Sequence, residues 1–395
     1  MGGKPGDGRP RALRLLNLFD VAVTLIPNPH TEPLSAMNRR TFLKSTAASA
    51  GPLLLGTTAK GQNATPVIGS GEHRYECHHN WGTLPPDYGW QTTHNVALDA
   101  EGNVYITHQG TKDTKDNMDT VLVFDPRGRF VRSFGKEWHN GGHGIEIRRE
   151  GSEEFCYLAN TWTPTMKLVK TDLRGRVVWQ KGRPECPEYA PRAGGKEPNG
   201  MVTPPYNPTN INFLPDGGFT VGDGYGSHYL LNYDKDARLV KVFGGKGTEK
   251  GKFDTPHGNW LDTRDAANPR IVVCDRANAR LQTFTLAGDV VDATEKGKAV
   301  LFPANADTRG NLLLVPDLHA RVSLFGAGLT PLVHLGDDEE WRKRVLDGFK
   351  IRQQPREWLP GKFVHPHDAA FDKDGNIFVV EWVSTGRVTF LRKVS

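Results

Sequence analysis

The chain has 395 residues, of which 37% are hydrophobic and 24% charged, a composition typical of a globular protein rather than a disordered one. Its 44 glycines and 27 prolines favour many short strands joined by turns. The four cysteines form no Cys-x-x-Cys pair, which excludes a zinc ribbon, a thioredoxin motif and a disulfide-dense scaffold. A net charge of +5 would suit a nucleic-acid binder, but residues 1–59 carry +4 of it. No basic nucleic-acid surface is therefore predicted for the other 336 residues.

Residues 1–59 have the layout of an export leader. Arg39 and Arg40 form a twin-arginine pair, and a short apolar run over 47–55 follows it. This order resembles the bacterial twin-arginine (Tat) signal, and Ala59 ends a small-residue stretch suited to cleavage. The sequence predicts export to the periplasm or the outside of the cell, with a disordered basic tail as the alternative interpretation. No stretch reaches 18 apolar residues, so no membrane span is predicted.

Met37 directly precedes the twin-arginine motif. We therefore hypothesise that translation begins at Met37 and that residues 1–36 are not translated. Mass spectrometry of the N-terminus in the source organism checks this, and a peptide from residues 1–36 would contradict it.

An internal repeat is the main feature of residues 60–395. An apolar strand, a turn such as Asp-x-x-Gly-Asn and a second strand recur in six copies, as in HNVALDAEGNVYITHQG. The copies begin near His94, His143, Thr209, His257, Ala304 and His367. Their spacing of roughly 45–65 residues matches the four-stranded blade of a β-propeller. The sequence predicts an all-β fold, a six-bladed β-propeller over residues 60–395.

The ends of the repeat array predict how the ring closes. The last copy ends at Val388–Lys393, which would be its third strand, and its fourth strand is missing. His73–Trp81 is a strand-like segment without a partner, so we expect it to complete the last blade and close the ring. Pro184–Pro208 is interpreted as a long loop, and a degenerate seventh blade is the alternative. Trp341–Trp358 has a helical pattern and is predicted to be an insertion between blades five and six.

Histidine dominates one column of the aligned copies, at the residue that opens the innermost strand. The six residues of the column are His94, His143, Thr209, His257, Ala304 and His367. Innermost strands line the central channel, and copies two, four and six are alternate blades about 120° apart. His143, His257 and His367 can therefore converge, and three imidazoles with an open fourth position are the usual catalytic zinc site. His94 could be a further ligand, a group that orients a ligand or a substrate contact. Hydrogen bonding to rim carbonyls is the alternative for all four histidines.

A second column lies where the second strand returns to the same rim. It consists of His108, Asn160, Asp223, Asp275, Asp317 and Glu381. Mostly acidic residues at such positions are expected to cap turns by accepting backbone N–H bonds. Just beyond this column, Tyr225 could act as a base and Arg276 could hold a carboxylate; rim packing and a surface ion pair are the alternatives. Asp368 could ligate a hard cation such as calcium, or cap a turn.

Longer stretches carry a resemblance to a known family. PTNINFLPDGGFTVGDGYGSHYLLNYDKDARLVKVFG, GKFDTPHGNWLD and CDRANARLQTF resemble NHL-repeat propellers, and more narrowly the peptidyl-α-hydroxyglycine α-amidating lyase domain. HPHDAAFDKDGNIFV, HGIEI and HNVALDAEGNVYITHQG fit the same family. The resemblance covers roughly residues 90–395 apart from loops.

The resemblance implies a reaction that splits a peptidyl hydroxyglycine into an amide and glyoxylate. It implies a zinc held by His143, His257 and His367, with Tyr225 as the catalytic tyrosine and Arg276 near the active site. It also implies a structural calcium, with the side chain of Asp368 and the carbonyl of Ile145 as ligands.

One position departs from the family pattern. Where the family has an essential arginine between His and Gly, this chain reads His108-Gln109-Gly110, and a glutamine brings no positive charge to a carboxylate or an oxyanion. His94 also replaces a small residue. Two interpretations stay open. The first is a metal-dependent lyase-like enzyme whose substrate could be a peptide, a small hydroxy acid or a sugar derivative. The second is a non-enzymatic exported propeller that binds a ligand or protein through its rim, with metal as a structural plug.

Overall fold

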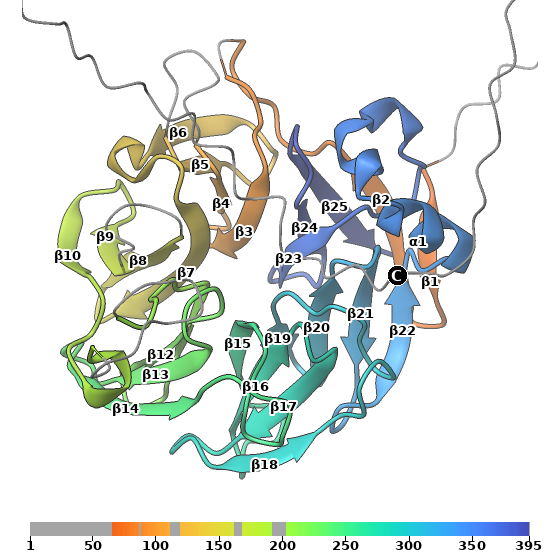
Figure 1. Cartoon of the computed structure of the whole chain (residues 1–395). Helices are drawn as coiled ribbons and strands as arrows, with labels where there is room; N and C mark the ends of the chain where they lie inside the picture. Colours follow the sequence, from red (N-terminus) through yellow and green to blue (C-terminus); the bar gives the residue numbers. More distant parts are fainter. Residues whose placement is uncertain (1–64, 87, 111–118, 162–167, 192–202, 395) are drawn as a thin grey trace, which may run out of the picture. The chain divides into compact units, whose positions relative to one another are not determined.

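The computed structural model describes residues 65–86, 88–110, 119–161, 168–191 and 203–394, and the predicted leader over 1–59 lies outside them. The described residues form six antiparallel sheets arranged around a central axis (Figure 1). Five sheets have four strands and one has five. The prediction of a six-bladed β-propeller is confirmed.

Blades one to three follow each other in chain order, and each runs from its innermost strand outward. Blade one contains β3 (Thr93–Leu98), β4 (Val104–His108), β5 (Val121–Phe124) and β6 (Phe130–Phe134). Blade two contains β7 (Gly142–Glu150), β8 (Glu153–Asn160), β9 (Leu168–Asp172) and β10 (Val177–Lys181). Blade three contains β11 (Asn210–Phe213), β12 (Phe219–Gly222), β13 (Tyr229–Tyr233) and β14 (Leu239–Gly244).

Blades four and five repeat this order, and blade six combines the two ends of the described chain. Blade four contains β15 (Pro256–Asp262), β16 (Arg270–Asp275), β17 (Arg280–Phe284) and β18 (Val290–Ala293). Blade five contains β19 (Asp307–Arg309), β20 (Leu312–Asp317), β21 (Arg321–Phe325) and β22 (Pro331–Leu335). Blade six contains β23 (Pro366–Phe371), β24 (Ile377–Glu381), β25 (Arg387–Lys393), β2 (His73–His79) and β1 (Val67–Ser70).

An N-terminal strand closes the ring as predicted. β2 pairs antiparallel with β25, from Tyr75 opposite Lys393 to His79 opposite Thr389. β1 then pairs with β2 and adds a fifth strand that the sequence did not predict. Because the first described strands complete the last blade, every blade is packed between two others.

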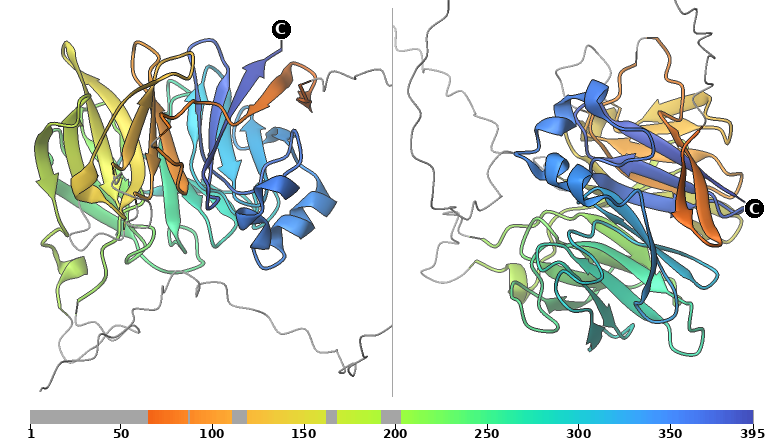
Figure 2. Two further views of the ribbon diagram at one scale, coloured as in Figure 1. Left: turned by 90° about the horizontal axis from the view of Figure 1, so that it is seen from above. Right: turned by 90° about the vertical axis from the view of Figure 1, so that its right-hand side faces the viewer.

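Helical structure is limited to the connections. The predicted insertion between blades five and six contains α1 (Glu339–Leu346) and the 3-10 helices η4 (Lys350–Gln353) and η5 (Pro355–Glu357). In Figure 2 this helical insertion is drawn in blue and lies beside strands that are also blue. Two further 3-10 helices are η2 (Lys136–Trp138) and η3 (Pro187–Tyr189). The described part of Pro184–Pro208 contains η3 and no strand. None of the helices in the described ranges is long and apolar enough to cross a bilayer.

The recurring Asp-x-x-Gly-Asn stretch builds the turn between the first two strands of a blade. In blade one, Asp99 Oδ1 accepts hydrogen bonds from the backbone N–H groups of Glu101 and Asn103, at 3.0 and 2.8 Å. Gly102 has φ +82°, a conformation that glycine adopts without steric cost. Asp372 makes the same pair of bonds in blade six. The recurring Asp-x-x-Gly-Asn pattern therefore marks a turn that its own local hydrogen bonds stabilise.

Residues at the end of the second strand hold the chain that enters the first strand. Asp223 accepts from Asn207 N at 2.6 Å, and Asp275 accepts from Asp254 N at 2.8 Å. Equivalent bonds run from Leu301 N to Asp317 and from Val364 N to Glu381, both at 2.6 Å. The capping expected for this column is thus present in blades three to six, and it fixes the rim at which the innermost strands begin.

Ring closure depends on apolar contact between β2 and the rest of blade six. Tyr75 is 1% exposed and packs in a cluster with Leu314, Phe363 and Leu391. We expect Tyr75→Ala to lower the free energy of unfolding by about 3–5 kcal/mol, because a large buried side chain leaves a cavity. Val67→Ala, at a residue 53% exposed on β1, should change it by less than about 0.5 kcal/mol. Chemical denaturation measures both, and equal effects would contradict a stabilising role for β2.

Candidate metal centre

Four histidines of the first column occupy the same kind of backbone irregularity. In β7 the pairing with β8 shifts between Gly142 and Gly144, so that His143 is an extra, unpaired residue. The same shift skips His94 in β3, His257 in β15 and His367 in β23. A β-bulge re-aims the side chain of its extra residue. The bulges therefore direct these imidazoles differently from the regular pleat of their strands.

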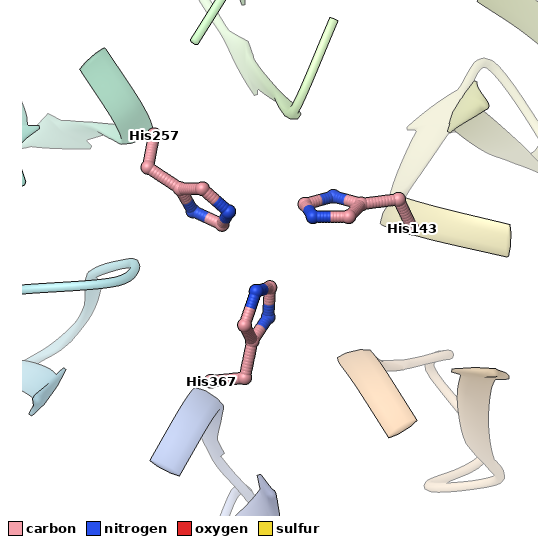
Figure 3. A group of neighbouring side chains, drawn as sticks. All are labelled: His143, His257 and His367. Carbon is pink, nitrogen blue, oxygen red and sulfur yellow. The ribbon is translucent and has the colours of Figure 1, made fainter. Parts of the chain in front are cut away.

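His143, His257 and His367 converge at the centre of the ring (Figure 3). They come from β7, β15 and β23, the innermost strands of blades two, four and six. Their ring centroids are 4.7–5.0 Å apart, and one ligand nitrogen from each lies within 4.8 Å of the other two. All three side chains are at most 2% exposed. The structure therefore brings together the three histidines that the sequence placed in alternate blades.

Hydrogen bonds to neighbouring blades fix the orientation of each ring. In each case Nδ1 donates to a backbone carbonyl of the next blade around the ring. The bonds join His143 to Thr209 (2.8 Å), His257 to Ala304 (2.7 Å) and His367 to His94 (2.7 Å). A carbonyl can only accept, so Nδ1 carries the hydrogen and Nε2 keeps its lone pair. Nε2 of His143 is buried without a hydrogen-bond partner among the described residues, which fits an electron-pair acceptor such as a metal ion.

The three rings are in the protonation state that a metal requires. Burial lowers the pKa of each of the three well below 6.5, and the charge of Arg276 lowers them further. The imidazoles are therefore neutral near pH 7, with no proton to displace from Nε2. Three neutral nitrogen donors around one point suit zinc and other first-row transition metals.

Tyr225 and Arg276 lie beside this cluster. The hydroxyl of Tyr225 is 3.0 Å from Nε2 of His257, and Nη1 of Arg276 donates to the same hydroxyl at 2.9 Å. Arg276 is 3% exposed, and its Nη2 has no hydrogen-bond partner in the part of the chain that the structure describes. Within that part no carboxylate forms an ion pair with it. A buried guanidinium without a counter-ion is costly, so this position favours an anionic ligand.

Two other predicted site residues, His94 and Gln109, make different contacts. His94 stacks on His143 with ring centroids 4.8 Å apart, and burial lowers the pKa of His94 to about 4. Gln109, in contrast, has its side-chain amide 3.4 Å from Oδ1 of Asn140. His94 thus lies against one side of the three-histidine cluster without joining it, and Gln109 contacts a neighbouring loop residue.

Asp368, the predicted calcium ligand, is buried in a polar network. Oδ2 accepts from Val96 N at 2.8 Å, and Oδ1 accepts from Nδ2 of Asn305 at 2.7 Å. Burial raises the pKa of Asp368 to about 8. Ile145 is buried in β7, and the next residue, Glu146, has its pKa raised by burial and by the charge of Asp368. Two nearby buried carboxyl groups without an ion-pair partner among the described residues fit a cation site.

Sequence reasoning missed Glu146 and Asn305. Asn305 follows the column residue Ala304, and its side chain crosses toward Asn210, whose Nδ2 donates to Asn305 Oδ1 at 2.6 Å. The sequence did contain a signal for Asn305, because a polar residue directly follows the first-column residue in several of the six copies. Gly258 makes room for this crossing, because a Cβ there would lie 2.4 Å from Cα of Asn305.

Comparisons with known proteins find relatives that are named for the same repeat, but they do not indicate a reaction. No family model matches the sequence. The mouse protein named NHL repeat-containing protein 3 is 28% identical over 229 residues, which are 53% of this chain and 60% of that protein. The human protein of the same name is 28% identical over 205 residues, 50% of this chain and 53% of that protein. The chain therefore spans less than two thirds of the length of these curated relatives.

The solved structures that match include two lyases, both with a TM-score below 0.5. A streptogramin B lyase has a TM-score of 0.49 and 10% identity, over 80% of this chain and 97% of that one. A catalytically inactive virginiamycin B lyase from Staphylococcus aureus with quinupristin has a TM-score of 0.47 and 11% identity, over 81% and 100%. At these scores neither likeness carries an argument about function. The six repeats and the six sheets around one axis show that this chain is a six-bladed β-propeller, and the relatives named for the same repeat support an NHL-type propeller.

Proposed function

We propose that this propeller is an exported, zinc-dependent, lyase-like enzyme that acts on a hydroxy acid or a hydroxyglycine-type peptide. The observation that carries the proposal is the convergence of three neutral imidazoles with Tyr225 and an unneutralised, buried Arg276. Such a set combines a metal site, a proton-carrying group and an anion-binding group at one point. The export leader over residues 1–59 is part of the proposal and rests on the twin-arginine motif alone.

The zinc would be held by Nε2 of His143, His257 and His367. When bound there, zinc supplies Lewis-acid polarisation of a hydroxyl or carboxylate oxygen. The protein's own contribution is orientation, since each imidazole is fixed through its Nδ1–H bond to a backbone carbonyl. Burial excludes bulk water and strengthens electrostatic attraction to an anionic substrate.

Arg276 and Tyr225 have separate tasks in this proposal. Nη2 of Arg276 has no hydrogen-bond partner among the described residues, and in this proposal it donates to a substrate carboxylate that neutralises the guanidinium. In the lyase reaction the substrate hydroxyl loses its proton, a carbonyl forms, and the carbon–nitrogen bond breaks with its electron pair leaving on nitrogen. The nitrogen gains a proton, so the products are an amide and glyoxylate without added water. In this proposal the Tyr225 hydroxyl relays the proton, and the hydrogen bond that it accepts from Nη1 of Arg276 at 2.9 Å supports this assignment.

We also propose a structural calcium beside the zinc site. Its ligands would be the carboxylate of Asp368 and the carbonyl of Ile145. Support comes from the buried carboxyl groups of Asp368 and Glu146 and from Oδ1 of Asn210, which has no hydrogen-bond partner in the described chain.

A second candidate is a non-enzymatic propeller that binds a ligand or a protein partner through its rim, with metal as a structural plug. Gln109 favours it, because this residue brings no charge and its amide contacts Asn140. The metal centre is common to both candidates. Turnover is what separates them.

Metal content tests the shared part of the proposal. We expect the zinc-loaded, dialysed protein to retain about one zinc per chain by elemental analysis, and a chelator to lower its Tm. His257→Ala should lose the metal, because it removes one of three ligands. His365→Ala is the matched control, since His365 is a buried histidine whose Nδ1 bonds to the carbonyl of Leu318. Wild-type protein that binds no transition metal would overturn the proposal.

Glyoxylate release from an α-hydroxyglycine peptide tests the chemistry. We expect zinc-loaded protein to release glyoxylate and Tyr225→Phe to lower kcat by about 100-fold at unchanged zinc content, because the proton relay is lost. Tyr206→Phe, at a tyrosine buried in the core around blade three, should keep the wild-type rate. Full activity in Tyr225→Phe would contradict its role. A zinc-loaded protein without turnover on peptides or small hydroxy acids would favour the binding propeller.

A further inference from the structure

We propose that Tyr189 is a positioning residue for Tyr225. Its hydroxyl fixes the carboxylate of Asp223, and this carboxylate fixes the turn that carries Tyr225 to the metal centre. The inference rests on the role that the proposed function gives to Tyr225, and it adds a residue from the connection between blades two and three. Three features of the structure carry it: the turn around Asp223, the bond that Tyr189 makes to it and the contacts of the Tyr225 hydroxyl.

The turn that carries Tyr225 is wrapped around the side chain of Asp223 and connects β12 with β13. The backbone carbonyl of Asp223 accepts hydrogen bonds from Gly226 N and His228 N, at 3.2 and 3.1 Å. Its Oδ2 accepts a further bond from Ser227 N at 2.6 Å. A Cβ at Gly226 would lie 2.0 Å from Oδ1 of Asp223, so only glycine leaves room for the carboxylate.

The same carboxylate also holds the segment that bonds to the backbone of Tyr225. Oδ1 of Asp223 accepts a hydrogen bond from Asn207 N at 2.6 Å. The carbonyl of Asn207 in turn accepts from Tyr225 N at 3.3 Å. Asp223 therefore fixes both the turn and the neighbouring backbone, and a shift of its carboxylate would move the two together.

Tyr189 supplies the only side-chain hydrogen bond to Asp223 in the part of the chain that the structure describes. Its hydroxyl donates to Oδ2 at 2.7 Å. Asp223 is fully buried, and among the described residues no cation pairs with it. Burial raises the pKa of this carboxyl to about 7, and the bonds from Asn207, Ser227 and Tyr189 act in the opposite direction. Because the carboxylate has no counter-ion there, these three donors decide where it lies.

Tyr189 is itself held tightly by its surroundings. It ends the 3-10 helix η3 and is 2% exposed. Its ring packs edge-on against the rings of Tyr206 and Tyr229, with centroids 5.6 and 5.8 Å away. A ring packed in this way presents its hydroxyl at a fixed point, so Tyr189 locates the carboxylate of Asp223.

The hydroxyl of Tyr225 lies at the other end of this chain of contacts. It is 3.0 Å from Nε2 of His257, and it accepts from Nη1 of Arg276 at 2.9 Å. Both are hydrogen-bond distances, so a shift of the turn by about 1 Å would break these contacts, and a misplacement of that size can cost about 100-fold in rate. Tyr189 thus acts on the proposed proton relay through Asp223 and the backbone of the turn.

Turnover of an α-hydroxyglycine peptide by the zinc-loaded full-length chain is the first test. We expect Tyr189→Phe, which keeps the packed ring and removes only the hydroxyl, to lower kcat on the order of 10–100-fold at unchanged zinc content. KM should stay the same, because Arg276 and the metal centre, which bind the substrate, do not move. Tyr206→Phe is the matched control. It removes the hydroxyl of a neighbouring buried ring that does not bond to Asp223, so its kcat should equal that of the wild type.

Gly226→Ala acts on the same carboxylate from another side. Its added Cβ would displace Oδ1 of Asp223 and leave the Tyr189 hydroxyl in place. We expect a similar loss of kcat. The double variant with Tyr189→Phe should lose no more than the more impaired single variant, because both changes act through Asp223. Losses that multiply in the double variant would contradict this shared route.

Fluorine NMR of a fluorotyrosine placed at position 225 tests the inference without turnover. We expect the signal to shift in Tyr189→Phe and in Gly226→Ala, because both changes move the turn that carries the labelled ring. It should keep its wild-type position in Tyr206→Phe, which removes a hydroxyl from the same core without acting on Asp223. If Tyr189→Phe fails to fold, the signal of Gly226→Ala decides alone.

The outcomes separate this inference from the proposed function. An unchanged fluorine signal in Tyr189→Phe, or an unchanged kcat of that variant in an active enzyme, overturns the positioning role and leaves the proposed enzyme standing. Shifted signals in a zinc-loaded protein that turns over no hydroxyglycine peptide support the link from Tyr189 to Tyr225 and overturn the catalytic use of Tyr225. An equal shift in Tyr206→Phe would assign the effect to core packing and also overturn the positioning role.

Discussion

The hydrogen bond from a histidine Nδ1 to the backbone carbonyl of the next blade is the interaction on which the centre of this molecule depends. It joins His143 to Thr209, His257 to Ala304 and His367 to His94. Each bond at once connects two blades, fixes the tautomer and leaves Nε2 facing the axis. Because every bond needs a neighbouring blade at the correct distance, the site exists only in the closed ring.

Closure of the ring in turn depends on strands from both ends of the described chain. β2 completes blade six through its pairing with β25, and Tyr75 anchors it in the core. Blade six also carries β23, whose residues His367 and Asp368 belong to the two cation sites proposed here. β2 therefore stabilises both the fold and blade six, the blade that carries the proposed ligands His367 and Asp368. A loss of β2 would weaken the proposed chemistry without touching a site residue.

Burial decides which groups at the centre of the ring are neutral and which carry a charge without a partner. The imidazoles stay neutral because desolvation lowers their pKa values, while Arg276 keeps a positive charge with an unpartnered Nη2. Nearby, Asp368 and Glu146 are buried acids without cationic partners in the described chain. A buried guanidinium without a counter-ion and buried carboxyl groups without a cation are costly to hold inside a protein. Bound metal ions and an anionic substrate would offset that cost.

Repeats, turns and column residues could be read from the sequence because they are local. Period-two strands and the Asp99-type turn recur in each copy, and their spacing predicts the number of blades and the alternate placement of His143, His257 and His367. The bulges, the strand β1, the carboxyl of Glu146 and the stacking of His94 on His143 could not be predicted. They depend on side chains from copies far apart in the chain, which meet only after the blades have packed around one axis. The sequence alone thus determined the architecture and the three histidines, and the tertiary structure decided which other groups join them.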